Sequence, residues 1–349
     1  MTDEAAIPAG IHYSELRQGI VFDGVLVRDL VGLPLGPRPG RPGRAAILDF
    51  LAGNSTLGVH LVELTAPEAE GHRHADETTF LVLTGSGTLE VRQEDDAEPV
   101  QVPWRAGDLL AIPLNAWHRV VPDPAAGPAR LLFVKTSRLI RKLFHDGDFN
   151  HANPFRFRLR YADEPGYFAI RKPGNYGKVR AHVVRDLSAE PLAADPDAGT
   201  DVAIVRYQMG GHRLLDHALV EVAPGGSVRP HRPLAEEVLV ILSGSGRTEL
   251  TAEDGRTLTI DWTAGDLVAP PFGWTRRHLP TGSGPARWLR IGNGFIERVL
   301  GVKGNTSLDG ELPVRDPGPL ESDRSSLAAE IARAEASIAD AAPRAGDES

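Results

Sequence analysis

The chain has 349 residues, enough for about two ordinary domains, and its 41% hydrophobic and 24% charged residues are typical of a soluble globular protein. The formal net charge of −9 argues against nucleic acid or an anionic membrane as a partner, and the absence of cysteine excludes disulfides and thiolate ligands. No apolar run approaches the length of a membrane span, and residues 1–4 lack the basic start of a signal peptide, so a cytoplasmic location is expected.

Short apolar or alternating runs, separated by Gly, Pro and Asp turns, predict β-strands along most of the chain. In the first half these runs lie at 61–64, 80–83, 88–91 and 131–134. In the second half they lie at 219–222, 238–242 and 288–291. Short strands at this regular spacing predict an all-β protein built as a sandwich or a jelly-roll barrel.

Four sequence elements recur 157 to 159 residues later in the chain, which indicates two copies of one unit. They are Val-Arg-Asp-Leu at 27–30 and 184–187, Gly-Ser-Gly at 85–87 and 244–246, Ala-Gly-Asp-Leu at 106–109 and 264–267, and Pro113 with Pro271. We therefore divide the chain into an arm and first unit at 1–137, a linker at 138–177, a second unit at 178–297 and a tail at 298–349. The tail carries a predicted amphipathic helix at about 323–341.

The first unit contains a candidate metal site. His72 and His74 are two positions apart, so their side chains would project from the same face of an extended strand. His118 follows the turn 113–117, where a later strand would re-enter the same barrel. Three imidazoles suit a divalent transition metal and leave coordination positions open for chemistry. Glu77 has the opposite parity and is predicted to point away from this site.

These residues resemble the two motifs of the cupin family, Gly-x5-His-x-His-x3,4-Glu-x6-Gly and Gly-x5-Pro-x-Gly-x2-His. Gly85 sets the register, which places His72 and His74 in the two His positions and Thr78 where the family has Glu. The first Gly is replaced by Ala66, and the second motif reads Gly107, Pro113, Asn115 and His118, with Asn115 replacing a Gly. The resemblance implies two tandem cupin barrels (double-stranded β-helix, or jelly-roll) with short flanking helices, and the pairing of such barrels implies a homo-oligomer.

Strand parity also predicts which side chains face the site. Thr78 shares the parity of the histidines, and its hydroxyl is expected to donate a hydrogen bond to a bound oxygen species. The predicted apolar wall consists of Phe80, Val82, Trp117 and Val120. Arg73 and Arg119 have the opposite parity and are predicted to face outward, so parity identifies no arginine for a substrate carboxylate.

The second unit has lost this ligand set. With Gly244 setting the register, the corresponding positions hold His231, Pro233, Glu237 and Arg276. An Arg cannot bind a cation, and an unpaired buried charge would cost several kcal/mol, so Arg276 is predicted to pair with Glu237. His278 shares the parity of Arg276 and could join His231 in a metal-free polar pocket. Three alternatives stay open for this barrel, namely a structural partner, a second ligand pocket and an unusual metal site, and we expect one metal per chain.

Two-barrel cupins with one carboxylate-free three-His site resemble the ring-cleaving dioxygenases of the gentisate and salicylate type. The resemblance implies Fe(II) at His72, His74 and His118, with O2 and a small, metal-chelating and anionic substrate such as a hydroxylated aromatic acid or a specialised metabolite. Because imidazoles suit several metals, Mn, Ni, Cu or Zn stay open. So do a metal-dependent isomerase, cyclase, lyase or decarboxylase in which the ion acts as a Lewis acid, and a ligand-binding protein without turnover.

Overall fold

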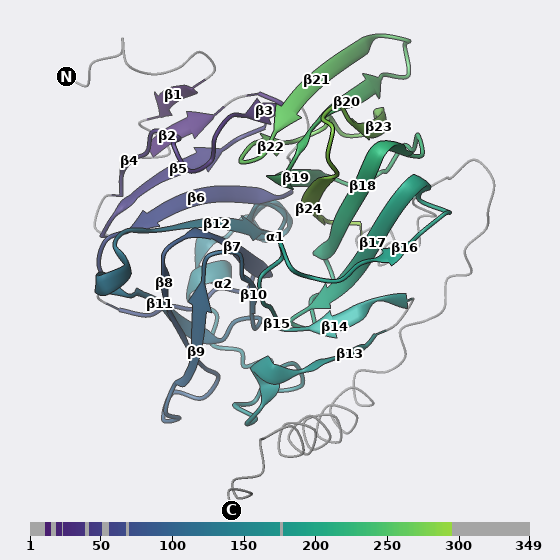
Figure 1. Ribbon diagram of the computed structural model, residues 1–349. Coiled ribbons are helices and arrows are strands. Elements are labelled where there is room, and N and C mark those ends of the chain that lie inside the picture. The colour runs from purple at the N-terminus through teal and green to yellow at the C-terminus, as the bar shows by residue number, and fades with distance from the viewer. Residues whose placement is uncertain are drawn as a thin grey trace, which may run out of the picture.

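The computed structural model describes residues 11–14, 19–22, 24–38, 42–50, 56–67, 70–174 and 177–294, and it consists of two β-barrels side by side (Figure 1). The prediction of an all-β protein is confirmed. The described helices are short: η2 (Pro124–Ala126), α1 (Ser137–Phe144), α2 (Gly147–His151) and η3 (Tyr167–Ala169). None of them has the length and apolarity needed to cross a membrane. The helix predicted at 323–341 lies outside the described residues.

The first barrel combines a nine-stranded and a three-stranded sheet, and all the strands predicted in the first half belong to it. The large sheet has the order β1 (Ile11–Ser14), β2 (Gly19–Phe22), β5 (Arg44–Leu48), β6 (Gly58–Leu64), β12 (Ala129–Lys135), β7 (Thr78–Thr84), β10 (Leu109–Ile112) and β15 (Val183–Val184), with β4 (Gly36–Pro37) beside β5. The small sheet has the order β11 (Trp117–Pro122), β8 (Ser86–Arg92) and β9 (Val100–Arg105).

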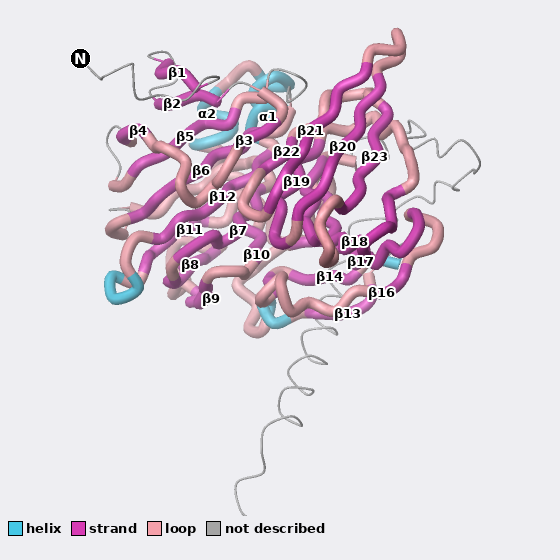
Figure 2. Tube along the Cα trace, turned by 45° about the horizontal axis from the view of Figure 1, so that its top comes forward, coloured by secondary structure: helices cyan, strands magenta, loops and turns pink. Residues whose placement is uncertain are grey.

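The second barrel repeats this plan with the same two sheet sizes. Its large sheet has the order β13 (Arg171–Pro173), β14 (Val179–Ala181), β17 (Gly199–Met209), β18 (Asp216–Val228), β24 (Ala286–Gly292), β19 (Glu237–Ser243), β22 (Leu267–Val268) and β3 (Leu26–Val27), with β16 (Ala193–Ala194) beside β17. Its small sheet has the order β21 (Thr257–Thr263), β20 (Ser245–Thr251) and β23 (Thr275–Pro280). Figure 2 shows these strands running side by side in both barrels.

The two copies exchange a strand, and two of the repeated motifs make this contact. β3 of the first copy pairs with β22 of the second, and β15 of the second copy pairs with β10 of the first (Figure 1). Arg28 donates to Asp266 at 2.6 Å, and Arg185 donates to Asp108 at the same distance. Each Val-Arg-Asp-Leu motif therefore docks on the Ala-Gly-Asp-Leu motif of the other copy.

A pair of glutamates strengthens the contact between the barrels. Glu77 accepts hydrogen bonds from the backbone N–H groups of residues 213–215 at 2.6 to 2.9 Å, and so points away from the histidines, as its parity predicts. Glu236 accepts in the same way from Thr56 and Leu57 at 3.0 to 3.1 Å. Buried carboxylates that accept several N–H bonds fix the two barrels against each other.

The apolar core has three parts. One cluster combines residues from both barrels and includes Leu132 on β12 and Leu289 on β24, the equivalent strands of the two large sheets. The other two fill the interiors of the first and second barrels. The first interior also holds Tyr161, Tyr167 and Ile170, so the segment predicted as a linker at 138–177 completes this core.

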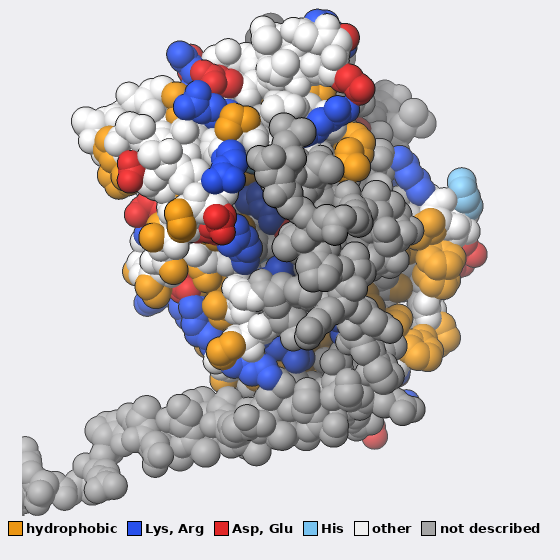
Figure 3. All heavy atoms as spheres, turned by 90° about the vertical axis from the view of Figure 1, so that its right-hand side faces the viewer, with side chains coloured by type: hydrophobic (Ala, Val, Ile, Leu, Met, Phe, Trp, Pro, Cys, Tyr) orange, Lys and Arg blue, Asp and Glu red, His pale blue; other side chains and the backbone are white. Residues whose placement is uncertain are grey.

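Charged side chains of both signs are interspersed on the described surface in Figure 3. Several charged side chains pair across neighbouring strands. Arg119 donates to its cross-strand partner Glu90 at 2.7 Å, and Arg247 donates to Asp261 at the same distance. Arg119 therefore faces outward from the first barrel, as predicted.

Three buried histidines at the contact between the barrels predict sensitivity to acid. Burial lowers the pKa of His182, His212 and His217, for His217 to about 3, although the charges of Glu77 and Asp216 oppose the shift of the latter two. In the unfolded chain they would titrate near their usual value of about 6.5. Between the pKa values of the folded and unfolded states, the unfolded chain therefore binds more protons. The stabilising contribution of the three histidines is thus fully present above about pH 6.5 and falls as the pH drops.

Urea denaturation between pH 8 and 5 measures this effect, which we expect to reach roughly 1.4 kcal/mol per pH unit for each fully displaced histidine. Among the described residues, neither ring nitrogen of His182 has a hydrogen-bond partner. His182→Leu should therefore flatten the acid slope, while His145→Asn at an exposed position leaves it unchanged. Equal slopes for His182→Leu and the wild type would contradict the prediction.

Candidate metal centre

The structure brings His72, His74 and His118 together inside the first barrel. The backbones of His72 and His118 form an isolated bridge, with two N–H to C=O hydrogen bonds of 2.9 Å. The ring centroids lie 4.5 to 5.6 Å apart, and one ring nitrogen from each histidine lies within 4.8 Å of the others. Three nitrogens at this spacing could converge on one ion.

Backbone acceptors hold two of the rings in the tautomer that a metal needs. Nδ1 of His74 lies 3.2 Å from the carbonyl oxygen of Asp76, and Nδ1 of His118 lies 3.0 Å from that of Ala116. An acceptor at Nδ1 requires the proton there, which leaves Nε2 as a lone-pair donor. Among the described residues, Nε2 of His74 is buried without a hydrogen-bond partner.

The electrostatics of the site favour neutral imidazoles. Burial, followed by the charges of His118 and Lys135, holds the pKa of His74 well below its usual range. A neutral imidazole with a buried, unpaired nitrogen is the donor that a divalent transition metal takes. The residues present therefore fit a metal ion.

A buried carboxylate that the sequence analysis missed supports His74. Oδ1 of Asp76 lies 3.4 Å from Nδ1 of His74 and accepts a hydrogen bond of 2.8 Å from the Thr78 hydroxyl. Oδ2 accepts from Nδ2 of Asn150 at 2.9 Å. The Thr78 hydroxyl therefore donates its hydrogen bond to Asp76. This corrects the expectation that the hydroxyl donates to a bound oxygen species.

Removing this support should weaken metal binding. Asp76→Asn is expected to lower the affinity of the apoprotein for Mn(II) or Fe(II) roughly 10–100-fold, because outer-sphere partners fix the orientation and basicity of a metal-binding imidazole. Thr78→Val should also lower the metal affinity, but by a smaller factor. Competition with a chelator measures the affinity.

The matched control is Thr79→Val, the next residue of β7. Its hydroxyl lies 3.1 Å from Nε2 of His217 and faces the second barrel instead of the site. Metal affinity should therefore stay at the wild-type value. An Asp76→Asn variant that binds metal as tightly as Thr79→Val would show that Asp76 does not orient His74.

The loop before His118 explains one departure from the cupin pattern. Asn115, at a Gly position of the motif, has a φ of 52°, and the corresponding Gly273 has a φ of 71°. Asn tolerates this left-handed conformation better than most residues. Its side-chain amide also donates to the carbonyl oxygens of Asn153 and Phe155 at 3.0 and 2.7 Å.

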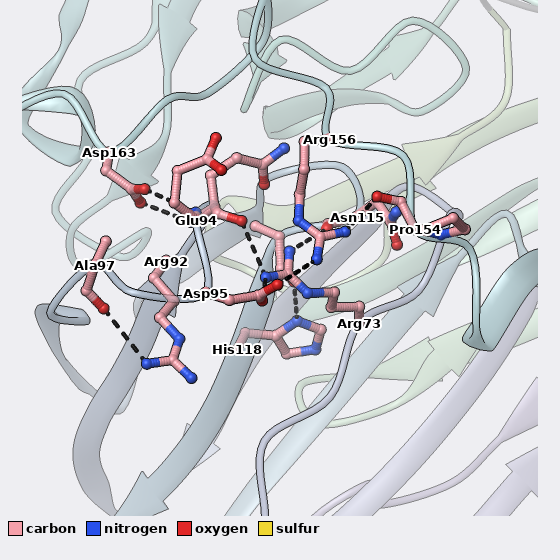
Figure 4. Close-up of polar contacts among 12 residues, drawn as sticks. Arg73, Arg92, Glu94, Asp95, Ala97, Asn115, His118, Pro154, Arg156 and Asp163 are labelled. Carbon is pink, nitrogen blue, oxygen red and sulfur yellow. Dashed lines mark hydrogen bonds and ion pairs between the residues drawn. The ribbon is translucent and has the colours of Figure 1, made fainter.

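The predicted linker is tied to the same end of the barrel. Arg73 and Arg156 converge on Asp95, at 2.5 and 2.8 Å (Figure 4). Asp163 accepts from the backbone N–H groups of Gln93 and Glu94 at 2.6 and 3.0 Å. Arg73 therefore points away from the three histidines, as its parity predicts, and helps to hold the 153–163 segment near His118.

A cavity of roughly 50 Å³ opens beside the three histidines. Of the predicted apolar wall, only Val120 lines it, together with Val62, Leu64 and Phe133. Phe80 and Val82 belong to the same interior core but do not line the cavity, and Trp117 packs under the guanidinium of Arg92, 4.5 Å from the ring centre. Parity identified the correct face of the strands but not the depth of each side chain.

The cavity also holds polar side chains that the sequence analysis missed, namely Arg38, His60 and Lys135. Lys135 is the last residue of β12 and has the same parity as Phe133, so extending the predicted strand 131–134 by one residue would have found it. Arg38 lies in irregular chain after β4, where parity gives no direction.

The second barrel has a different centre at the corresponding place. His231 and Arg276 form the isolated bridge that His72 and His118 form in the first barrel. Nη1 of Arg276 donates to Oε1 of Glu237 at 2.7 Å, which confirms the predicted pair. Burial opposes the charge of Glu237, but Arg276 and Arg290 lower its pKa to about 2.

His231, Glu237 and His278 nevertheless offer ligand atoms within 4.8 Å of one another. Nδ1 of His278 lies 2.9 Å from the Thr248 hydroxyl, which itself accepts from Nε1 of Trp262 at 3.0 Å. Nδ1 of His278 is therefore engaged by Thr248, which leaves only Nε2 of this ring for an ion. The guanidinium of Arg276 adds a positive charge at the same place.

The chain thus consists of two barrels of one topology, and the first barrel carries three converging histidines that could hold a metal ion. Residues 60–135 match the family described as "Cupin domain". The oxalate decarboxylase of Bacillus subtilis has a similar structure, with a TM-score of 0.51 at 18% identity over 82% of this chain and 79% of the other. Residues 60–135 of the first barrel thus match a cupin domain, and the chain as a whole shares the two-barrel fold of the decarboxylase.

Curated relatives match shorter segments. Auxin-binding protein 1 of Arabidopsis thaliana is 36% identical over 104 residues, which cover 27% of this chain and 51% of the relative. An acireductone dioxygenase of Puccinia graminis f. sp. tritici is 39% identical over 54 residues, 16% of this chain and 30% of the relative. The chain thus spans about half or less of these relatives.

Proposed function

We propose that the first barrel is the active site of a metal-dependent dioxygenase, in which His72, His74 and His118 hold one divalent ion, with Fe(II) favoured. One observation carries the proposal: acceptors fix Nδ1 of His74 and His118, and Nε2 of His74 is buried and unpaired among the described residues. A bound ion would supply redox or Lewis-acid chemistry at a chelating substrate oxygen. The similarity to acireductone dioxygenases over a short segment supports the dioxygenase class.

The chain's own residues would prepare this reaction. Asp76 orients His74, and the 153–163 segment restrains the loop that carries His118. Val62, Leu64, Val120 and Phe133 exclude water from the carbon part of a substrate. The second barrel, with Arg276 on Glu237, would act as the structural partner.

The second candidate is a non-oxidative lyase or decarboxylase that uses the same ligands. The similarity of the fold to oxalate decarboxylase and the basic cavity favour it as the alternative. In this reaction the ion would polarise a carboxylate or carbonyl oxygen without net consumption of O2.

Anaerobic reconstitution with Fe(II), Mn(II), Ni(II) or Zn(II), followed by a panel of small chelating acids, separates the candidates. Oxygen uptake that requires Fe(II) and a substrate supports the dioxygenase. CO2 release or isomerisation without oxygen uptake supports the second candidate. Fully loaded protein that turns over no acid in the panel would count against both and favour a ligand-binding role.

A further inference from the structure

The outer side of α1 and α2 is an exposed apolar surface. Leu143 and Phe144, in the last turn of α1, are 63% and 48% exposed. The ring of Phe144 stacks on that of Phe149 in α2, with 3.7 Å between the ring centroids. We call these three side chains the α1–α2 patch. Large apolar side chains that lie together at the surface indicate a place that another element or molecule covers.

The inner side of the two helices is fixed to the first barrel. The side chain of Asn150 donates to Asp76 at 2.9 Å, and its carbonyl oxygen accepts from the N–H group of Ala75 at 2.8 Å. The hydroxyl of Thr136, directly before α1, accepts from the N–H group of Glu77 at 3.0 Å. Both helices are therefore held in place beside the three histidines, and the α1–α2 patch is presented on a fixed support.

The chain leaves the described residues next to α1. Nδ2 of Asn293 donates to the hydroxyl of Thr56 at 2.6 Å. The carbonyl oxygen of Thr56 accepts from the N–H group of Leu139, in the first turn of α1, at 3.1 Å. The described residues end at Gly294, one position after Asn293. The tail therefore starts beside α1, whose eight residues span only about 12 Å.

The tail contains a segment, 323–341, with the properties of a partner for this patch. The segment lies outside the described residues, and its sequence predicts an amphipathic helix with Leu327, Ile331, Ala334 and Ile338 along one stripe. Such a helix depends on burying its apolar face, because short isolated helices are marginal in water. Its four acidic and two basic residues give a net charge of −2, whereas α1 has three basic residues and no acidic one. Shape and charge are therefore complementary.

We propose that the segment 323–341 docks as a helix on the α1–α2 patch of its own chain, with the apolar stripe against Leu143, Phe144 and Phe149. The connection 295–322 has 28 residues, and at roughly 3.3 Å per extended residue it is much longer than the distance along α1. Such a tether raises the effective concentration of the segment to the order of millimolar. This favours the chain's own tail over a second copy of the protein at micromolar concentration. The docking does not depend on a bound metal or on the proposed function.

Hydrogen exchange of the full chain, followed by mass spectrometry, tests the docking. The amides of residues 327–338 should exchange about 10-fold or more slowly than those of an unstructured chain, because a docked helix opens only rarely. The rates should not change on dilution of the protein. Leu143→Asp/Phe144→Asp should abolish the protection, since it places two charges in the contact. Leu327→Asp/Ile331→Asp leaves the two helices intact and should in turn speed exchange in α1.

Phe272→Asp is the matched control, because Phe272 is also 48% exposed but lies in the turn before β23 of the second barrel. It should leave the protection of residues 327–338 unchanged, and a thermal melt checks the fold of each variant. Three results would overturn the proposal. The first is a wild-type segment without protection, and the second is protection that persists in Leu143→Asp/Phe144→Asp. The third is protection that disappears on dilution, which would assign the patch to a second copy of the chain.

Discussion

His118→Ala is expected to abolish stoichiometric metal binding, lowering the content from about one ion per chain to a trace. A centre of three imidazoles loses a ligand outright, so the fall in affinity should exceed the roughly 10–100-fold that follows loss of an outer-sphere partner. The fold should survive, because the bridge between His72 and His118 is made by backbone atoms that alanine retains. Elemental analysis after reconstitution gives the stoichiometry, and a thermal melt checks the fold.

His278→Ala is the matched control in the second barrel. It removes a buried imidazole from the other potential ligand group, so it should leave metal content unchanged if only the first barrel binds an ion. Wild-type protein with two ions, of which His278→Ala loses one, would show that the second barrel also binds metal. His118→Ala protein with wild-type metal content would overturn the assignment of the first site.

Local periodicity predicted seven of the strands (β6, β7, β8, β12, β18, β19 and β24) and the group of three histidines. Because side chains alternate along a strand, the spacing of His72, His74 and Glu77 places the two histidines on one face and the glutamate on the other. The near-constant spacing of the repeated motifs likewise predicted two barrels. Both inferences depend only on residues close together in the sequence or on self-similarity.

The exchange of β3 and β15 could not be predicted in the same way. Both copies carry the same Val-Arg-Asp-Leu and Ala-Gly-Asp-Leu motifs, so the sequence cannot say whether a motif docks on its own copy or on the other. The choice depends on the path of the chain between the barrels, which is a tertiary property.

The surroundings of the metal centre could not be predicted from the sequence for a related reason. Asp76 lies in a bend between His74 and β7, where strand parity does not apply, so its hydrogen bond from Thr78 could not be inferred. Arg38 reaches the cavity from a segment of irregular chain. A period of two predicts the face of a strand, but irregular segments lack such a rule, and they supply much of the polar chemistry here.

Arg276→Met should destabilise the protein by roughly 3–5 kcal/mol, because it leaves Glu237 in the second barrel without its closest cation. Arg276 is fully buried and lies 2.7 Å from one carboxylate oxygen of Glu237, while Arg290 lies 3.3 Å from the other. The double variant Arg276→Met/Glu237→Leu should recover most of the loss, since Arg290 retains Asp216 as its partner. Urea denaturation of the four proteins of this cycle measures the coupling.

The pH dependence gives an independent check of this ion pair. In the wild type the pKa of Glu237 is about 2, below its usual 4.5, so its contribution to stability is present above about pH 4.5 and lost as the pH falls toward 2. In Arg276→Met the carboxyl should titrate at higher pH, and the destabilisation should shrink on acidification because protonation removes the buried charge. Arg277→Met, at an exposed pair 3.7 Å from Glu249, should cost no more than about 0.5 kcal/mol at any pH. If Arg276→Met and Arg277→Met lowered the free energy of unfolding equally, the Arg276–Glu237 pair would not be what stabilises the second barrel.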